Sequence, residues 1–221
     1  MIKILLKNAE SFTAVGDVDQ SIYSFRGSFR DYFEDFYQDF DVVRAYDMLA
    51  KLSINPNDKL KSMSKGTKEK VQLTKFTVDL AAGRVPVIAG TGGNCTESTL
   101  TLTQEIETLG VDGLLIITPY YNKCTEAGLI SHFEKIADAV STPIIMYSVP
   151  SRTGVNMDAG AVAALKEHPN IVGLKEASGN ISQVCRLAAH ISDAFSIYSG
   201  NDDQVVPLLS LGRSEEHTSE L

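Results

Sequence analysis

Five short runs of apolar residues recur through the second part of the chain. They occupy residues 85–90, 113–118, 143–147, 171–175 and 195–198. Each run is rich in valine, isoleucine and leucine and lacks regularly alternating polar positions, so each predicts a strand that is buried on both faces. Between the runs, apolar residues recur at three- and four-residue spacing over 129–140 and 181–191, and this spacing predicts amphipathic helices.

The predicted strands begin at residues 85, 113, 143, 171 and 195, so one strand and one helix together take 24 to 30 residues. This period matches the (β/α)8 barrel, in which about 250 residues are shared among eight units, better than a doubly wound sheet. The expected fold class is therefore α/β, an incomplete (β/α)8 TIM barrel. Five strands do not close such a barrel, and residues 1–76 show no Val/Ile-rich strand that ends in a glycine loop. We expect an irregular, partly helical N-terminal region.

Polar residues and glycines mark the expected helix ends. The residues predicted to open helices are Thr96, Asp158 and Asn180, and the residue predicted to close one is Gly110. Three histidines lie on helix patterns or beside a proline, and we interpret them as solvated or capping residues. They are His132, His168 and His190.

The composition excludes several classes of protein. Hydrophobic residues make up 43% and charged residues 22% of the 221 residues, as in globular proteins rather than disordered chains. No apolar run approaches the roughly 20 residues that a membrane span needs, and the apolar stretch after Met1 is too short for a signal peptide, so we expect a cytoplasmic protein. The cysteines at 95, 124 and 185 form no C-x-x-C pair, which argues against a disulfide framework and a zinc site.

The net charge is −8, and the acidic residues concentrate in the second part of the chain. Residues 77–212 hold 14 Asp and Glu against 7 Lys and Arg. An acidic surface repels the phosphate backbone, so we do not expect nonspecific binding of nucleic acid by this part.

Candidate catalytic residues stand where predicted strands end, because the carboxyl ends of barrel strands carry catalysis. Lys175 ends an apolar strand, where a desolvated lysine keeps a usable fraction of the neutral amine that attacks a ketone to form a Schiff base. The alternative is a lysine that turns outward and pairs with Glu176. Tyr147 ends the preceding strand and could relay protons, and Arg152 in the following loop could grip a carboxylate. The alternatives are a tyrosine packed on the rim and a solvated arginine.

Five strings of residues at these strand ends resemble the successive motifs of one enzyme family. They are Gly90-Thr91-Gly92-Gly93-Asn94, Thr118-Pro119-Tyr120-Tyr121-Asn122, Tyr147-Ser148-Val149-Pro150-Ser151-Arg152-Thr153-Gly154, Gly173-Leu174-Lys175-Glu176-Ala177-Ser178-Gly179 and Ser199-Gly200-Asn201-Asp202-Asp203. In order and spacing these strings resemble the dihydrodipicolinate synthase family over residues 76–212. The resemblance implies that this segment corresponds to about strands 3–7 of the family's barrel. The resemblance implies a class I aldolase-type lyase that condenses pyruvate with aspartate semialdehyde in lysine biosynthesis, through a covalent Schiff base and with neither cofactor nor metal.

The resemblance also implies a role for each candidate residue. Lys175 is implied as the Schiff-base lysine, Tyr147 as the proton-relay tyrosine and Arg152 as the carboxylate-binding arginine. Tyr121 is implied as a tyrosine lent across a tight dimer interface, and a homo-oligomer, either a dimer or a tetramer, is expected. From the residues alone, the aromatic pair of Tyr120 and Tyr121 more often fills an interface than catalyses.

The sequence departs from the family pattern at two places. Asn94 and Tyr120 resemble residues that bind lysine in feedback-inhibited members, but Ser98 stands where those members often have a glutamate. The family's Gly-Thr-Thr-Gly-Glu loop, whose threonines complete the proton relay and hold the carboxylate of pyruvate, does not occur. We therefore expect this chain to have little or no activity, and an open sheet predicts aggregation or a molten state.

Residues 1–75 carry two shorter resemblances to other families. Residues 12–28 resemble the third motif of superfamily 1 DNA helicases, and residues 37–73 resemble an ABC-transporter ATPase, with its signature motif at 63–73. A working nucleotide site also needs a Gly-x-x-x-x-Gly-Lys-Ser/Thr loop, and the sequence has none. One alternative function is a nucleotide- or DNA-binding module built on residues 12–73. The ABC-like fragment alone is also described by a charged amphipathic helix preceded by a polar turn. A third alternative is that the chain has no function.

Three resemblances within one short chain favour a chimera, an artificial or misassembled fusion of residues 1–75 with residues 76–212. Residues 213–221 resemble translated sequencing-adapter read-through and are expected to form a disordered tail. The chimera is a hypothesis. Its motivation is that each resembling segment lacks an element that its family requires, namely a nucleotide-binding loop in two cases and the strands that close the barrel in the third.

Overall fold

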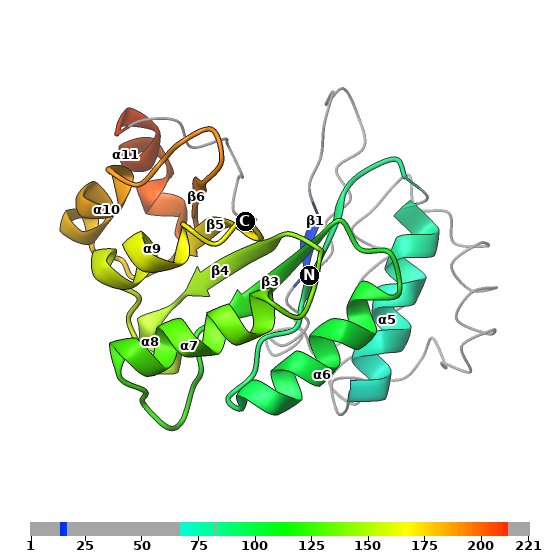
Figure 1. The fold of residues 1–221 in the computed structure, drawn as a ribbon. Helices are drawn as coiled ribbons and strands as arrows, with labels where there is room; N and C mark the ends of the chain where they lie inside the picture. The colour runs from blue at the N-terminus through cyan, green and yellow to red at the C-terminus, as the bar shows by residue number, and fades with distance from the viewer. Residues whose placement is uncertain (1–13, 17–66, 82, 212–221) are drawn as a thin grey trace.

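The computed structural model describes residues 14–16, 67–81 and 83–211 of the chain, with side chains described for 70–81 and 83–211. Six parallel strands form one sheet in chain order (Figure 1). They are β1 (Ala14–Gly16), β2 (Val87–Gly90), β3 (Gly113–Ile117), β4 (Ile144–Ser148), β5 (Ile171–Glu176) and β6 (Ser196–Ser199). A sheet in which each strand neighbours the next is the arrangement of a (β/α)8 barrel, and it agrees with the incomplete barrel expected from the sequence.

Helices connect successive strands and form a layer along one face of the sheet (Figure 1). They are α5 (Thr67–Ala81), α6 (Thr96–Glu107), α7 (Glu126–Ala137), α8 (Pro150–Thr153), α9 (Ala159–Leu165), α10 (Ile181–Ala188), the 3-10 turn η1 (Asp202–Gln204) and α11 (Val205–Ser210). Neighbours in this layer pack in chain order, α5 on α6, α6 on α7, α7 on α9, α9 on α10 and α10 on α11. The five strands predicted from residue 85 onward all form, and each begins within two residues of its predicted start.

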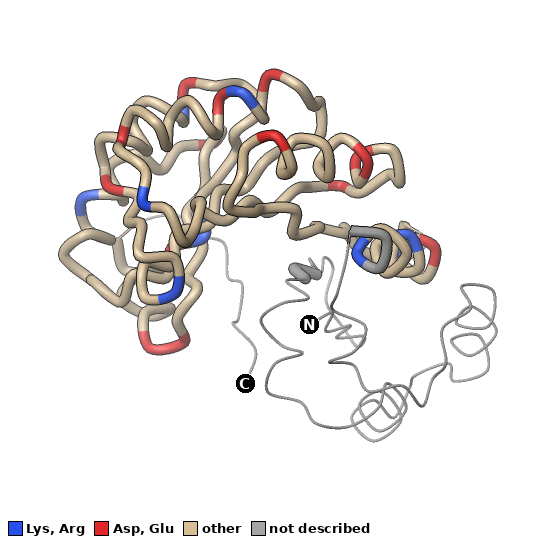
Figure 2. Tube along the Cα trace, turned by 90° about the horizontal axis from the view of Figure 1, so that it is seen from below, with Lys and Arg blue, Asp and Glu red and all other residues tan. Residues whose placement is uncertain are grey.

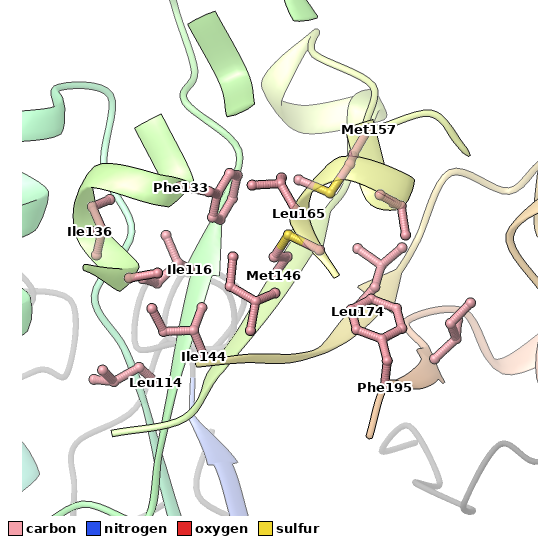
Figure 3. Close-up of a cluster of buried hydrophobic side chains, with 14 of the residues drawn as sticks. Leu114, Ile116, Phe133, Ile136, Ile144, Met146, Met157, Leu165, Leu174 and Phe195 are labelled. Atoms are coloured by element: carbon pink, nitrogen blue, oxygen red, sulfur yellow. The ribbon is translucent and has the colours of Figure 1, made fainter. Parts of the chain in front are cut away.

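A large apolar core fills the space between the sheet and the helices. Strands β2 to β6 supply side chains to it from one side, and helices α5, α6, α7, α9, α10 and α11 close it from the other. Figure 3 shows part of this core. The labelled residues are Leu114, Ile116, Phe133, Ile136, Ile144, Met146, Met157, Leu165, Leu174 and Phe195, none more than 2% exposed. Their burial is the main stabilising contribution to the fold.

The opposite, inner face of the sheet carries a smaller apolar cluster. Its buried members are Ile88, Leu115, Ile145, Tyr147, Val149 and Ala177, and its half-buried members are Ile117, Val172 and Tyr198. The register between β4 and β5 shifts after Ile144, so that Ile145 pairs with Gly173 and Tyr147 pairs with Lys175. Ile171 and Leu174, an odd number of residues apart, both reach the outer core because of this shift. The same shift turns Lys175 to the inner face.

Two features of the amino-terminal part differ from the expectation. A strand was not predicted before residue 76, yet β1 pairs in parallel with β2, Ala14 beside Val87. Strand pairing uses backbone groups, so a short extended segment can satisfy the edge of β2 without a strand-like side-chain pattern. Helix α5 runs continuously from Thr67 to Ala81, across the expected boundary between residues 75 and 76. The region from 17 to 66 and the tail from 212 onward lie outside the described residues.

The helix caps follow the sequence prediction with one exception. The side chain of Asp158 accepts from the N–H groups of Gly160 and Ala161, and that of Asn180 accepts from Gln183. Gly110 has the positive φ of 79° expected for a residue that ends a helix. Thr96, however, is inside α6, and Cys95 is its N-cap. The Thr96 hydroxyl is instead hydrogen-bonded to His132 at 2.8 Å.

Charged residues lie on the described helices and loops far more than on the strands (Figure 2). Lys175 and Glu176, at the end of β5, are the exceptions among the described strands. Within the described residues, no helix is both long and apolar enough to span a membrane. Lys175 and Glu176 are thus two charged residues in a sheet whose other described strand residues carry no charge.

His132 is not the solvated residue that its place on a helix pattern suggested. It is 4% exposed, because the face of α7 that carries it packs against α6. Its Nδ1 is bonded to Thr96, and its Nε2 has no hydrogen-bond partner in the structure. Burial lowers the pKa of His132 from 6.5 to about 4, so the ring is neutral in the folded protein at pH 7.

We expect this histidine to make stability fall in weak acid. Between pH 6.5 and 4 the unfolded chain binds the proton before the folded chain does, so the free energy of unfolding decreases as pH falls, by about 3 kcal/mol. His132→Gln should remove this part of the pH dependence in chemical denaturation curves. His190→Gln is the matched control, and an equal effect of both variants would contradict the assignment.

Candidate active site

The carboxyl ends of the parallel strands lie at one edge of the sheet, where the sequence-predicted residues follow them. Tyr147 and Lys175 are the penultimate residues of β4 and β5. The register pairs Tyr147 with Lys175, and Lys175 with Tyr198 of β6. Register partners in neighbouring strands point to the same face, so Lys175 is flanked by a tyrosine on each side.

The amine of Lys175 lies over the face of the Tyr147 ring. Its Nζ is 4.6 Å from the ring centroid, within the range of a cation–π contact. Tyr147 is itself 4% exposed and belongs to the inner apolar cluster, so the ring is held in place by packing. The strand register thus brings together two of the residues that the sequence predicted for one site.

Glu176 occupies the other side of the strand and is 1% exposed. Its carboxylate accepts hydrogen bonds from the backbone N–H of Ser178 at 2.8 Å and from Gln183 Nε2 at 3.4 Å. Desolvation raises the pKa of this buried carboxyl group above its ordinary value, although the same hydrogen bonds oppose the shift. The alternative of a Lys175–Glu176 pair does not fit this arrangement, because successive strand residues point to opposite faces.

Tyr198 is a candidate site residue that the sequence reasoning did not single out. A Cβ placed on Gly173 would lie 3.1 Å from Cε2 of the Tyr198 ring, so the ring leans across the glycine on the inner face. Glycine leaves room for the ring there, since a side chain at that position would collide with it and with the backbone of Ser196. Its position could have identified it in the sequence, because Tyr198 ends a predicted strand, as Tyr147 and Lys175 end theirs.

The loop after β3 presents Tyr121 on a strained turn. The N–H of Asn122 donates to the carbonyl of Tyr120 at 3.0 Å, and the φ of Tyr121 is 69°. This is a γ-turn with a positive central φ, a rare and costly conformation for a residue with a side chain. Tyr121 is 84% exposed, and its ring meets the Tyr120 ring edge to face, with 5.0 Å between centroids. Strain of this kind concentrates at sites of catalysis or contact.

Arg152 lies in α8, the single helical turn that follows β4. Pro150 opens this turn, the N–H of Arg152 donates to the carbonyl of Val149 at 2.9 Å, and Gly154 ends it with a φ of 70°. The Arg152 side chain is exposed. Its place one loop beyond Tyr147 puts it at the carboxyl-end rim of the sheet.

The two residues predicted for an effector site lie in neighbouring loops at the same edge. Asn94 is exposed in the glycine-rich loop after β2, and Tyr120 is half-buried after β3. A Cβ on Gly92 would lie 2.4 Å from the backbone N of Ile117, so this loop packs directly on the end of β3. Ser98 is exposed in the first turn of α6, where its hydroxyl donates to the carbonyl of Cys95 at 3.1 Å.

Within the part of the chain that the structure describes, no three His, Cys, Asp or Glu side chains are grouped so that they could hold a metal ion. Of the three free cysteines, Cys95 and Cys185 are exposed and Cys124 is half-buried. The candidate groups described at this edge of the sheet are the amine of Lys175, the phenols of four tyrosines and the guanidinium of Arg152.

Comparison with known proteins identifies relatives of this arrangement. The 4-hydroxy-tetrahydrodipicolinate synthase of Alkaliphilus oremlandii is 49% identical over 144 residues, which are 65% of this chain and 50% of that protein. The dihydrodipicolinate synthase of Acinetobacter baumannii, determined with pyruvate, superposes with a TM-score of 0.65 at 40% identity, over 68% of this chain and 52% of that one. The synthase of Cyanidioschyzon merolae, determined with lysine, gives 0.66 at 38% identity, over 77% and 61%.

The chain spans about half the length of the curated relatives it matches. The solved relatives confirm an α/β fold with a parallel sheet that represents part of a TIM barrel. A second sequence model, that of the UvrD/REP helicase N-terminal domain, matches residues 1–41 and so includes the predicted segment 12–28. No comparison supports the expected ABC-transporter resemblance at 37–73 or the read-through origin of the tail.

The family assignment rests on sequence and structure together. The sequence model of the dihydrodipicolinate synthetase family matches residues 61–219, well over half of the chain. That match includes the strand ends that carry Tyr121, Tyr147, Arg152 and Lys175. The chain therefore belongs to the dihydrodipicolinate synthetase family.

Proposed function

We propose that this chain carries the Schiff-base chemistry of its family, with Lys175 as the nucleophile. The neutral amine adds to the ketone carbon of pyruvate, and loss of water leaves an imine. Loss of a proton from the methyl carbon then gives an enamine, whose carbon attacks the aldehyde of aspartate semialdehyde. The observation that carries the proposal is the Lys175 amine, 4.6 Å above the centre of the Tyr147 ring at the carboxyl end of a barrel strand.

The other candidate residues receive roles that fit their positions. Tyr147 is proposed to relay protons, because its phenol ring lies directly beside the amine on which the imine forms. Arg152, exposed at the rim, is proposed to bind the substrate carboxylate with its planar guanidinium. Tyr121, exposed on its strained turn, is proposed to reach the site of a second copy across a dimer interface. The proposal assigns no organic cofactor and no metal.

The relatives support pyruvate as the ketone. The Acinetobacter baumannii synthase was determined as a pyruvate complex, and the curated relatives carry the name 4-hydroxy-tetrahydrodipicolinate synthase. Because the chain spans about half of these relatives, the imine step and the complete condensation are separate proposals.

Borohydride trapping separates these two steps. Incubation of the full chain with pyruvate and sodium borohydride, followed by intact mass and peptide mapping, should give a single reduced pyruvate adduct on Lys175. Condensation with aspartate semialdehyde should be at least about 100-fold slower than in a relative such as the Alkaliphilus oremlandii enzyme, because the sequence lacks the paired threonines of the relay. Absence of an adduct, with that relative trapped in parallel, would contradict the proposal.

Asn94 and Tyr120 are proposed as contacts for a lysine effector. Their loops are neighbours at one sheet edge, and the Cyanidioschyzon merolae relative was determined with lysine bound. Ser98 provides no carboxylate for the amino groups of lysine, so lysine should bind this chain weakly, with a dissociation constant of about 1 mM or higher. Isothermal titration with lysine measures this affinity.

The composite origin of the chain is a further proposal, in which an amino-terminal segment and the family segment come from different sources. The family match covers residues 61–219 and so extends beyond the expected segment 76–212 at both ends, which moves the junction to before residue 61 and leaves the read-through origin of the tail without support. The support for a composite origin is that the helicase match at 1–41 and the family match at 61–219 do not overlap. Independent sequence reads of the source DNA that cross codons 41–61 without a break would contradict it.

A further inference from the structure

We propose that the buried hydroxyl pair of Thr118 and Thr153 is a positioning contact that fixes Arg152 relative to the loop of Tyr120 and Tyr121. Thr118 directly follows β3, and Thr153 is the last residue of α8, after β4. The inference rests on the proposed function, since it concerns the geometry of the same site. The role proposed for Thr118 and Thr153 is structural, since neither side chain is proposed to contact the substrate.

The Thr153 hydroxyl is the centre of a local hydrogen-bond network. It accepts from the hydroxyl of Thr118 at 3.1 Å and from the backbone N–H of Val155 at 3.2 Å. It donates toward the carbonyls of Val155 at 3.0 Å and Val149 at 3.3 Å. A hydroxyl has one proton and two lone pairs, so this network uses its full capacity.

The hydrogen bond between the two hydroxyls is buried. Thr118 is 0% exposed and Thr153 is 6% exposed. If Thr153 lost its oxygen, the hydroxyl of Thr118 and the N–H of Val155 would be left buried without these acceptors, and water could not readily replace them. The pair therefore holds one geometry more firmly than an exposed pair would.

The network connects two of the candidate site loops. Arg152 immediately precedes Thr153, so the guanidinium is carried by a turn whose last residue is tied to the end of β3. Tyr121 lies three residues after Thr118, on the strained turn. The backbone N–H of Thr118 also donates to the carbonyl of Tyr147 at 3.0 Å, which brings the relay tyrosine's strand into the same network. One side-chain contact thus sets the spacing of the rim residues around Lys175.

The test compares Thr153→Val, which keeps the shape of the side chain but removes the oxygen, with Thr153→Ser, which keeps the oxygen. Thr142→Val is the matched control, because it removes a hydroxyl that donates to Glu107 at 3.0 Å just before the opposite end of β4. Two readouts are measured on the full chain. They are hydrogen exchange of the peptides covering 118–125 and 149–157, and the rate of borohydride trapping as a function of pyruvate concentration.

Thr153→Val should speed amide exchange in both peptides about tenfold. It should also raise the half-saturating pyruvate concentration by a similar factor, with the maximal trapping rate unchanged, because Arg152 is misplaced while Lys175 is intact. Thr153→Ser should restore both values, and Thr142→Val should change neither.

Faster exchange confined to 149–157, or an equal effect of Thr142→Val, would overturn the positioning contact. A wild-type chain that traps no pyruvate would overturn the proposed function instead. In that case, amide hydrogen exchange in the peptides 118–125 and 149–157 would still test whether the hydroxyl contact couples the two loops.

Discussion

Replacing Lys175 with alanine should abolish the pyruvate adduct, with a loss of at least about 100-fold in trapped product. The other lysines whose side chains are described lie on helices or in loops rather than on the sheet, so we do not expect them to substitute. Intact mass after borohydride reduction measures the adduct, and peptide mapping locates it. Lys175→Arg should be equally inactive, since a guanidinium stays protonated and is not a nucleophile.

Two other lysines serve as matched controls for this substitution. Lys123→Ala removes an exposed amine from the loop after β3, and Lys166→Ala removes one that faces Glu167 at 3.7 Å. Both variants should be trapped to the wild-type extent. Adduct that persists in Lys175→Ala, or that disappears in Lys123→Ala, would place the nucleophile elsewhere.

Replacing Phe133 with alanine should lower the free energy of unfolding by about 4 kcal/mol. The ring is 0% exposed at the centre of the core between α7 and strands β3 to β5, and its removal leaves a cavity that the neighbouring side chains fill only in part (Figure 3). Urea denaturation followed by far-ultraviolet circular dichroism measures the change. A marginally stable domain would lose most of its folded population through this one substitution.

Val206→Ala is the control for Phe133→Ala. Val206 is 76% exposed on α11, so truncation removes an apolar side chain without leaving a cavity, and its effect should stay within about 0.5 kcal/mol. If the two variants lost similar amounts of stability, the core between the sheet and α7 would not be packed as described.

Local sequence patterns predicted the strands from residue 85 onward because all are rich in apolar residues. Strands β2 to β4 are buried on both faces as expected, whereas in β6 only Ile197 is buried. A doubly buried strand must be apolar at nearly every position, so its signal needs no knowledge of its neighbours. The period of 24 to 30 residues then indicated a β/α barrel, and polar residues at strand ends indicated where chemistry would lie. The same patterns placed Lys175 and Tyr147 at the ends of adjacent strands, which is the arrangement found.

Residues whose environment depends on distant elements escaped these patterns. His132 has the spacing of a helix surface residue, but its burial depends on how α7 packs against α6. Tyr198 became a candidate through its close approach to Gly173 on a neighbouring strand. The hydroxyl contact of Thr118 with Thr153 joins residues that are 35 positions apart.

The sequence by itself determined the apolar strands, the repeat and the motif residues at the strand ends, because each depends on residues close together in the chain. Only the tertiary structure decided which face each residue occupies. The register between β4 and β5 shifts after Ile144, and this shift brings Lys175 to the inner face over Tyr147. A slip of one residue exchanges the two faces of a strand, and register is set by pairing between segments far apart in the chain.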